Sequence, residues 1–488
     1  MKLEVKDKNI KILFIISTIM LAIPSVVYLV MGKSISNLVS DFNYSLQIMP
    51  NNNMVNAMTF LGVFAFICIM YLLIIKRNDK LFVDNKAMFK FIIVVSFIFT
   101  IILPMTSTDV FYYISTGWAD ARYNINPYYT SVKELQDDLN LKNDEILNKM
   151  PKVWREQKIV YGPAWTLVCK GLSALSFGSL PIALLVYKLF NLLLHIANCF
   201  IIYKISKKKL ITLIYGLNPL ILFESLTNVH NDILLLFFML FGLYFIFRRP
   251  RNFYNVIIGV VLFAMATAVK YVAILILPFI IIYYYRKDNV FKRILKAVGL
   301  AFVFLSVLLS IYLLYSRDLE VIQGIFTQQS KMTKSLTLMA YIYISPQVAT
   351  KFSLITVRIF AIIYFGMLIR YLFKKNIIIT RINRRIYLLL VIFLLTVITG
   401  FQTWYIMWLL PFIMWQRGKN TKSIIYLTIA AELSTIIFFA FGEWYMLGGY
   451  YYLSMIAIWS ILNIVSKYKL RKRINLFFLI DGGFIDKI

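Results

Sequence analysis

Residues 91–113 read FIIVVSFIFTIILPMTSTDVFYY, an apolar run that ends in proline and is soon followed by a carboxylate. The run from Phe91 to Pro104 has no charged residue and can cross most of a membrane as a helix. Asp109 then stands where that helix reaches the membrane surface. A carboxylate at this place is costly unless it has a partner or a chemical task.

Similar apolar runs recur along the whole chain. Hydrophobic residues make up 60% of the 488 residues and charged residues only 15%, which is not the composition of a soluble domain. The first run, Leu13 to Met31, is followed by no small-residue cleavage site, so we expect a retained helix rather than a signal peptide. Three cysteines in or beside apolar runs indicate neither disulfides nor a metal site. The chain is predicted to be a polytopic membrane protein.

The net charge of +30 is spread over short basic clusters between alternate apolar runs. This is the pattern that the positive-inside rule produces on a cytoplasmic face. A nucleic-acid-binding stripe would instead be continuous on one soluble domain, so no nucleic-acid partner is expected. We therefore expect a multi-pass cell-membrane protein with both termini in the cytoplasm. The clusters are residues 76–90, 204–209, 248–251, 286–296, 374–385, 417–422 and 467–473.

The runs predict an all-α transmembrane bundle of about 12–14 helices. It forms one domain over residues 1–473, followed by a short cytoplasmic tail over 474–488. Two external loops are long, 105–180 and 316–352, and long loops in compact proteins are usually functional. Residues 131–150 of the first are predicted to form an amphipathic helix on the outer interface. The predicted spans are 12–31, 55–75, 88–104, 181–203, 209–226, 231–247, 253–269, 271–285, 294–315, 353–373, 386–400, 403–415, 423–441 and 449–466.

Two apolar stretches are too short for a pair of ordinary crossings. As one helix, residues 253–285 would be roughly 50 Å long, and the basic cluster after them would lie outside. Two short helices that meet near Lys270 satisfy both constraints, and residues 385–415 break similarly around Gly400–Trp404. Broken helices at membrane depth line protein-walled or wet cavities, so we expect a recessed cavity that opens outward.

This topology gathers polar and aromatic residues on the external side. Each also has an ordinary role available. Asp109 suits the N-cap of a helix that begins at Val110, and Asp120 with Arg122 suits a solvated pair. Lys270 suits a snorkelling lysine, and Trp404 suits an aromatic belt. The external set is Asp109, Asp120, Arg122, Asn126, Tyr161, Trp165, Glu224, Asn228, His230, Asn231, Asp232, Lys270, Gln402, Trp404 and Glu443.

The sequence lacks several common catalytic motifs. It has no phosphate-cradling glycine loop, no HExxH, no CxxC and no GxSxG nucleophile elbow. What remains is a carboxylate, a buried cation, amides and aromatic rings at an external, membrane-recessed cavity. A carboxylate can deprotonate an acceptor hydroxyl, and a cation can stabilise a departing phosphate. This equipment suits glycosyl transfer from a lipid-phosphate sugar.

A series of short motifs follows in order between about residues 105 and 415. They are Thr108–Tyr113, Asn126-Pro127-Tyr128, Tyr161-Gly162-Pro163, Asn218-Pro219, His230-Asn231-Asp232, Lys270-Tyr271, Pro278, and Trp404-Tyr405 with Trp408 and Pro411. In these motifs the chain resembles the GT-C superfamily of integral-membrane glycosyltransferases, and most closely the polyprenol-phosphate-mannose-dependent mannosyltransferases of bacterial envelopes.

The resemblance implies an inverting displacement in which Asp109 is the catalytic base and mannose is the transferred sugar. A polyprenyl-phosphate sugar would be the donor, and an envelope glycan or glycolipid the acceptor. No second acidic residue adjoins Asp109, so metal dependence stays open, with a divalent metal as one option. We expect Lys270, Arg122 and His230 to bind the donor phosphate. The residues expected to contact the sugar or acceptor are Asn231, Asp232, Asp120, Trp404, Trp165 and Tyr161.

Two other classes fit parts of this pattern. A flippase or transporter of a lipid-linked saccharide would also have many helices, broken segments and a cavity. No repeat of matching halves is visible, and the polar groups gather on one side rather than at the midplane. An envelope polysaccharide polymerase or ligase would also be external and lipid-linked, but would use a polyprenyl-pyrophosphate oligosaccharide.

Overall fold

The computed structural model describes residues 7–38, 53–141, 143–315, 335–415, 419–441 and 448–471. These residues are mostly helical and contain no β-strand, which confirms the predicted all-α class. Glu443, the predicted tail 474–488 and much of the predicted loop 316–352 lie outside the described residues.

The helices group into two compact units, each built from segments that are distant in the sequence. The first unit comprises residues 1–108, 191–230 and 403–488. Its elements are α1 (Asp7–Val30), η1 (Ile35–Asn37), α2 (Asn53–Lys76), α3 (Asn78–Leu81), α4 (Asn85–Ile101), α10 (Lys209–Gly216), α11 (Pro219–Ile221), η4 (Leu222–Thr227), η7 (Thr403–Trp415), α20 (Lys419–Phe441) and α21 (Gly448–Arg471).

The second unit comprises residues 109–190 and 231–402. The helix α9 (Leu180–Ser206) begins in this unit and ends in the first. The other elements are α5 (Asp109–Tyr123), α6 (Val132–Asp138), α7 (Glu145–Asn148), η3 (Lys152–Trp154), α8 (Pro163–Ala174), α12 (Asp232–Phe247), α13 (Phe253–Val269), η5 (Tyr271–Leu275), α14 (Leu277–Tyr284), α15 (Val290–Tyr312), α17 (Leu336–Tyr343), α18 (Pro346–Phe373), α19 (Ile379–Ile392) and η6 (Phe393–Val397).

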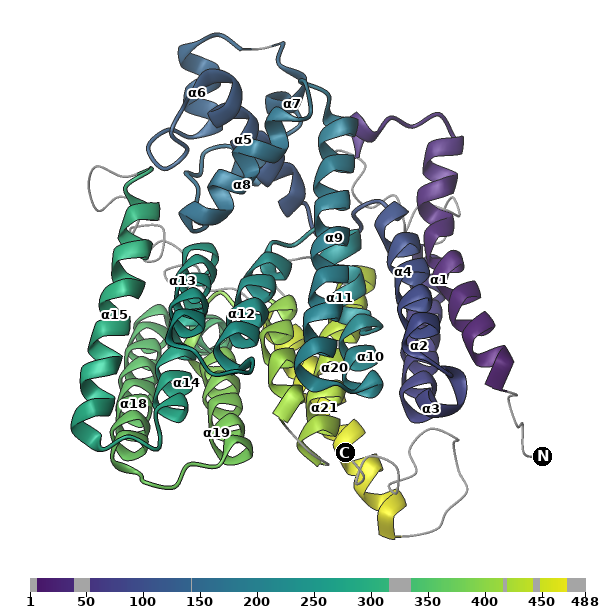
Figure 1. Cartoon of the computed structure of the whole chain (residues 1–488). Helices are drawn as coiled ribbons and strands as arrows, with labels where there is room; N and C mark the ends of the chain where they lie inside the picture. The colour runs from purple at the N-terminus through teal and green to yellow at the C-terminus, as the bar shows by residue number, and fades with distance from the viewer. Residues whose placement is uncertain are drawn as a thin grey trace. The chain divides into compact units, whose positions relative to one another are not determined.

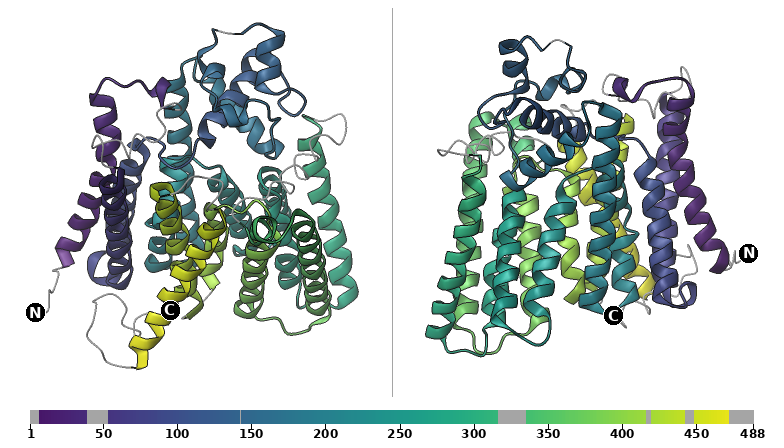
Figure 2. Two further views of the ribbon diagram at one scale, coloured as in Figure 1. Left: turned by 180° about the vertical axis from the view of Figure 1, so that it is seen from behind. Right: turned by 45° about the horizontal axis from the view of Figure 1, so that its top comes forward.

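Within the second unit, α12 and α13 pack closely, and α14 contacts both α18 and α19 (Figures 1 and 2). Glycine permits the close approach of α12 and α13. A Cβ atom on Gly242 would lie 3.0 Å from the Gly259 carbonyl oxygen, and one on Gly259 would lie 2.9 Å from that of Gly242. The pair brings the N-terminal end of α12 beside the C-terminal end of α13, where the candidate site lies.

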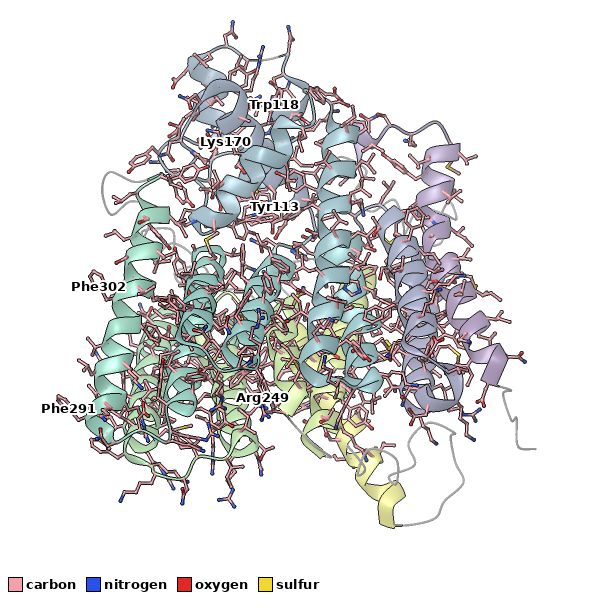
Figure 3. All side chains as sticks on the ribbon, in the orientation of Figure 1. Tyr113, Trp118, Lys170, Arg249, Phe291 and Phe302 are labelled. Carbon is pink, nitrogen blue, oxygen red and sulfur yellow. The ribbon has the colours of Figure 1, made fainter. Side chains whose placement is uncertain are left out.

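Several helices are long and apolar enough to cross a membrane. Among the described residues five such helices occur, in α1, α2, α9, α15 and α18. The pair α10 with α11–η4, bent by 44°, is apolar enough to count as a sixth if the two parts form one span. On α15, Phe291 and Phe302 project away from the helical bundle (Figure 3) and are 74% and 73% exposed. Large exposed apolar faces of this kind are typical of lipid contact. The protein is a multi-pass membrane protein.

The predicted break at Lys270 is confirmed. The helix α13 ends at Val269, Lys270 has an extended backbone (φ −148°, ψ 134°), and the short η5 leads into α14. The stretch around residue 400 is also broken, since α19 passes into η6 and the chain is irregular until η7 begins at Thr403. Residues 209–226, predicted as one span, are bent because Asn218 caps a new helix at Pro219.

The single amphipathic helix predicted over residues 131–150 is wrong. Ser131 and Glu134 form a capping box that starts α6, which ends at Asp138. Asn140 then has φ 51°, a left-handed conformation that no α-helix continues through. Asp144 caps the separate helix α7, because its Oδ1 accepts from the Leu147 backbone N–H at 2.9 Å.

Candidate functional site

Asp109 is the first residue of α5, and two tyrosine hydroxyls approach one oxygen of its carboxylate. The Tyr161 hydroxyl donates to Asp109 Oδ2 at 3.2 Å. Tyr113 lies one helical turn beyond Asp109, and its hydroxyl is 3.5 Å from the same oxygen and 3.3 Å from the Tyr161 hydroxyl. Burial, together with the neighbouring Tyr161 and Asp109, raises the pKa of Tyr113 well above its usual value. Tyr113 therefore stays protonated at neutral pH and can donate to the carboxylate.

Gly162 fixes Tyr161 against the end of α13. The Gly162 N–H donates to the Val269 carbonyl at 3.3 Å. A Cβ atom at position 162 would lie only 2.1 Å from the Ala268 carbonyl oxygen, so no larger residue fits without movement. Pro163 then begins α8, a favoured place for proline. The motif Tyr161-Gly162-Pro163 thus sets a tyrosine directly beside Lys270.

Lys270 and Asp232 form an ion pair at the ends of α13 and α12. Lys270 Nζ donates to Asp232 Oδ1 at 2.8 Å and to Oδ2 at 2.7 Å. The Asp232 side chain is fully buried, whereas that of Lys270 is 13% exposed. The ammonium also lies 6.0 Å from the centre of the Tyr161 ring, within the range of cation–π attraction. Tyr161 therefore connects the Asp109 carboxylate with the Lys270 ammonium in one cluster.

Asn231 lies next to Asp232 and is fully buried. Neither its side-chain oxygen nor its side-chain nitrogen has a hydrogen-bond partner among the described residues. A buried amide without partners destabilises the fold, because it loses its hydrogen bonds to water and forms none within the protein. Such a group is suited to bind the hydroxyls of a ligand that enters the cluster.

The structure places Asp120 and Arg122 away from Asp109. They lie near the C-terminal end of α5, so at 1.5 Å per residue Asp120 is roughly 16 Å along the helix from Asp109. Asp120 is buried and accepts from Lys170 Nζ and from the Tyr315 hydroxyl, both at 2.7 Å. Arg122 is exposed. Asp120 is therefore an ion-pair partner that joins α5, α8 and the end of α15, and neither residue belongs to the Asp109 cluster.

Trp165 does not present a ring face to a ligand here. It is fully buried, and its ring packs edge-on against Tyr113 with 5.1 Å between ring centres. The α5–α8 contact is tight, since a Cβ atom on Gly117 would lie 2.4 Å from the Cys169 carbonyl oxygen. Figure 3 marks Tyr113 and Lys170 on these two helices. Trp165 thus supports Tyr113 from behind instead of stacking on a sugar.

His230 and Trp404 belong to a second cluster, within the first unit. Their rings stack with 3.9 Å between centres and an angle of 18°. His230 Nε2 is 3.1 Å from Glu224 Oε2, which also accepts from Asn228 Nδ2 at 2.8 Å. His230, Glu224 and Asn228 are all fully buried, and Trp404 is nearly so. His230, which was predicted to bind the donor phosphate, therefore contacts Glu224 and Trp404 here. Trp404, which was predicted to contact the sugar, stacks on His230.

The sequence interpretation missed Glu432 on α20. Its carboxyl is fully buried and lies beside the Glu224 carboxyl. The signal that could have found it is a lone glutamate within an apolar span, which is a functional hypothesis by default.

No metal-binding group of three or more His, Cys, Asp or Glu side chains occurs in the part of the chain that the structure describes.

Comparison with known proteins identifies the family. The model of the family described as alpha-(1->6)-mannopyranosyltransferase, N-terminal domain, matches residues 13–286, which is more than half of the chain. No curated protein and no solved structure matches it. The matched region contains Asp109, Tyr161, Asp232 and Lys270, so the whole first cluster lies within it. The chain belongs to this mannopyranosyltransferase family and is a membrane mannosyltransferase.

Proposed function

We propose that the protein transfers mannose from a polyprenyl-phosphate donor to a hydroxyl of a glycan or glycolipid acceptor, with Asp109 as the base. The observation that carries the proposal is the Asp109 cluster. One compact unit holds an oriented carboxylate and a lysine that both lie beside Tyr161, and a buried amide without partners next to the aspartate that pairs with the lysine. These are the groups that activation of a hydroxyl, support of a leaving phosphate and recognition of a sugar require.

In the proposed step, Asp109 accepts the proton of the acceptor hydroxyl as its oxygen attacks the anomeric carbon. The bond between that carbon and the phosphate oxygen breaks, and the polyprenyl phosphate leaves with the bonding electrons. The single displacement inverts the anomeric configuration. Tyr161 and Tyr113 hold the Asp109 carboxylate in place through Oδ2.

Lys270 stabilises the charge that develops on the leaving phosphate. Asp232 accepts two hydrogen bonds from the ammonium and so fixes its position rather than contacting the sugar. The Asn231 amide, which can both donate and accept, binds sugar hydroxyls next to it. This assignment gives the His230-Asn231-Asp232 motif one member that orients the lysine and one that binds the ligand.

Purified protein in lipid vesicles, supplied with polyprenyl-phosphate mannose labelled in the sugar, tests the proposal. Transfer predicts labelled product together with an equal amount of free polyprenyl phosphate. Movement of intact donor across the bilayer without cleavage would instead support the flippase interpretation. Use of a polyprenyl-pyrophosphate oligosaccharide in place of the monophosphate would support a polymerase or ligase.

We propose further that the Asp109 cluster faces the outside of the cell and that both termini are cytoplasmic. The support is the series of basic clusters between alternate apolar runs. The three native cysteines are buried, so a single introduced cysteine can report exposure with little background. The exposed Asp138 on α6, replaced by cysteine, should react with a membrane-impermeant maleimide on intact cells. Reaction only after lysis would reverse the assigned orientation.

A further inference from the structure

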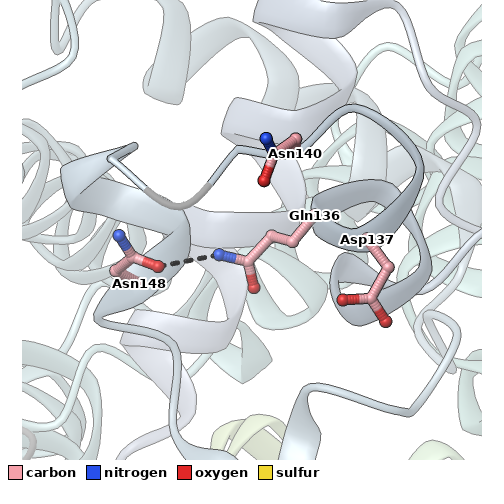
Figure 4. A pocket seen from close by; sticks show the side chains of 4 residues that line it. All are labelled: Gln136, Asp137, Asn140 and Asn148. Atoms are coloured by element: carbon pink, nitrogen blue, oxygen red, sulfur yellow. Dashed lines mark hydrogen bonds between the residues drawn. The ribbon is translucent and has the colours of Figure 1, made fainter.

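A polar pocket lies between α6 and α7, apart from the Asp109 cluster. It has a volume of about 540 Å³ and is lined by Gln136, Asp137, Asn140 and Asn148 (Figure 4). That volume is within the range of pockets that hold small molecules, about 300–1,000 Å³. None of the four residues takes part in the proposed transfer reaction, so the pocket has no role assigned so far.

Local structure holds the lining residues in place. Gln136 Nε2 donates to Asn148 Oδ1 at 2.9 Å and so ties α6 to α7 (Figure 4). Arg155 donates from Nε to the Met150 carbonyl at 3.1 Å and from Nη2 to the Asn148 carbonyl. Asn140, between the helices, has the left-handed φ of 51° that turns the chain around the pocket. The pocket is therefore built before any ligand binds.

The segment is also anchored to α5. Asp144, which caps α7, accepts through Oδ2 from Trp118 Nε1 at 2.9 Å and from the Tyr123 hydroxyl at 2.7 Å. Burial and the hydrogen bond to Asp144 raise the pKa of Tyr123 to about 12, so this phenol remains a donor at neutral pH. The helix that begins at Asp109 thus supports the pocket as well.

The chemistry of the lining selects one class of ligand. Three amides each offer donors and acceptors, and one carboxylate accepts, which matches hydroxyl groups that do both. A phosphate would need a cation, and none of the four lining residues that the structure describes is one. A divalent metal would need more than the single carboxylate of Asp137. An apolar ligand would find no apolar side chain among the four. A neutral, polyhydroxylated molecule fits best.

We propose that this pocket is a second saccharide site, which binds mannose units of the acceptor glycan away from the hydroxyl that reacts. The ligand class rests on the proposed function, since the acceptor of a mannosyltransferase that extends a glycan carries such units. The site would favour extended acceptors over short ones without changing the chemical step.

The test uses the double variant Asp137→Ala/Asn140→Gly of the full-length protein in nanodiscs. Alanine keeps α6 intact, and glycine tolerates the left-handed φ at position 140, so the side chains are removed without backbone strain. The matched control is Lys133→Ala on the same helix as Asp137, which removes an exposed ion pair between Lys133 and Glu156. Binding of α-(1→6)-linked mannotetraose is measured by saturation-transfer NMR, and transfer is measured with mono- and tetramannoside acceptors on one lipid aglycone.

We expect the double variant to bind mannotetraose at least about tenfold more weakly, because it loses one hydrogen bond to the Asp137 carboxylate and one to the Asn140 amide. Its KM for the tetramannoside should rise by a similar factor, with kcat and the monomannoside KM unchanged, and Lys133→Ala should match wild type. Equal mannotetraose binding by wild type and the double variant would overturn the saccharide site. The binding measurement needs no turnover, so a protein that binds mannotetraose through the pocket but transfers no mannose would contradict the proposed function alone.

Discussion

Removal of the Lys270 ammonium should separate its structural role from its chemical one. In Lys270→Met, the fully buried Asp232 carboxylate loses two hydrogen bonds of 2.7–2.8 Å. Breaking a buried ion pair from one side costs about 3–5 kcal/mol, because an uncompensated charge is left behind. Since Lys270 is 13% exposed, some water can reach the site, and we expect the lower end of that range.

The double variant Lys270→Met/Asp232→Asn removes both charges. It should recover most of the lost stability, because no unpaired carboxylate remains buried. It should not recover activity: loss of the cation that we propose to face the leaving phosphate should lower kcat/KM about 100-fold or more in both variants. The free energy of unfolding is measured by SDS titration in mixed micelles, and transfer with polyprenyl-phosphate mannose.

Two results would refute this reasoning. If Lys270→Met unfolds at the wild-type SDS concentration, Asp232 does not depend on the lysine for its burial. If the double variant regains wild-type kcat/KM, Lys270 serves only as the counter-ion of Asp232 and does not contact the donor phosphate.

Three further predictions concern Tyr161, Gly162 and Glu432. Tyr161→Phe keeps the ring beside Lys270 but loses the hydrogen bond to Asp109, so kcat/KM should fall about tenfold at nearly unchanged stability; an unchanged kcat/KM would show that this bond does not orient the base. Gly162→Ala should destabilise the protein by about 1–3 kcal/mol. Gly171→Ala on α8, where a Cβ atom would meet open space, should not destabilise it. If the two variants are equally stable in thermal unfolding, Gly162 is not required for the close packing against α13. Glu432→Gln should cost less than about 1 kcal/mol, because glutamine is nearly isosteric and its amide can donate to the neighbouring Glu224 carboxyl; a loss of several kcal/mol in the same assay would mean that glutamine cannot replace the carboxyl at this position.

The sequence predicts those features that follow from length and charge. The break at Lys270 comes from an apolar stretch too short for two full helices and a basic cluster that must stay inside. The observed extended backbone at Lys270 agrees with this. The closeness of Tyr161 to Lys270 is not visible from spacing, since it depends on how Gly162 packs against α13.

Other features depend on three-dimensional neighbours. The sequence suggests that Asp120 contacts the sugar or acceptor. Its observed partners, Lys170 and Tyr315, could not be predicted because they are 50 and 195 residues away in the chain. The sequence suggests that the Trp165 ring stacks on a sugar. Its burial becomes visible only in the structure, where the ring packs against Tyr113. The helix predicted over residues 131–150 is interrupted at Asn140 because local capping overrides an apolar periodicity.

The role of Asp109 as the base is tested most directly by transfer of labelled mannose from polyprenyl-phosphate mannose by Asp109→Asn, beside Asp138→Asn as a control at an exposed carboxylate. A base contributes about 10²–10⁴-fold, so Asp109→Asn should lose at least about 100-fold in kcat while Asp138→Asn stays at the wild-type rate. Asn is nearly isosteric and can still meet Tyr161, so the fold should be kept. A folded Asp109→Asn protein that transfers mannose at the wild-type rate would contradict the assignment of Asp109 as the base.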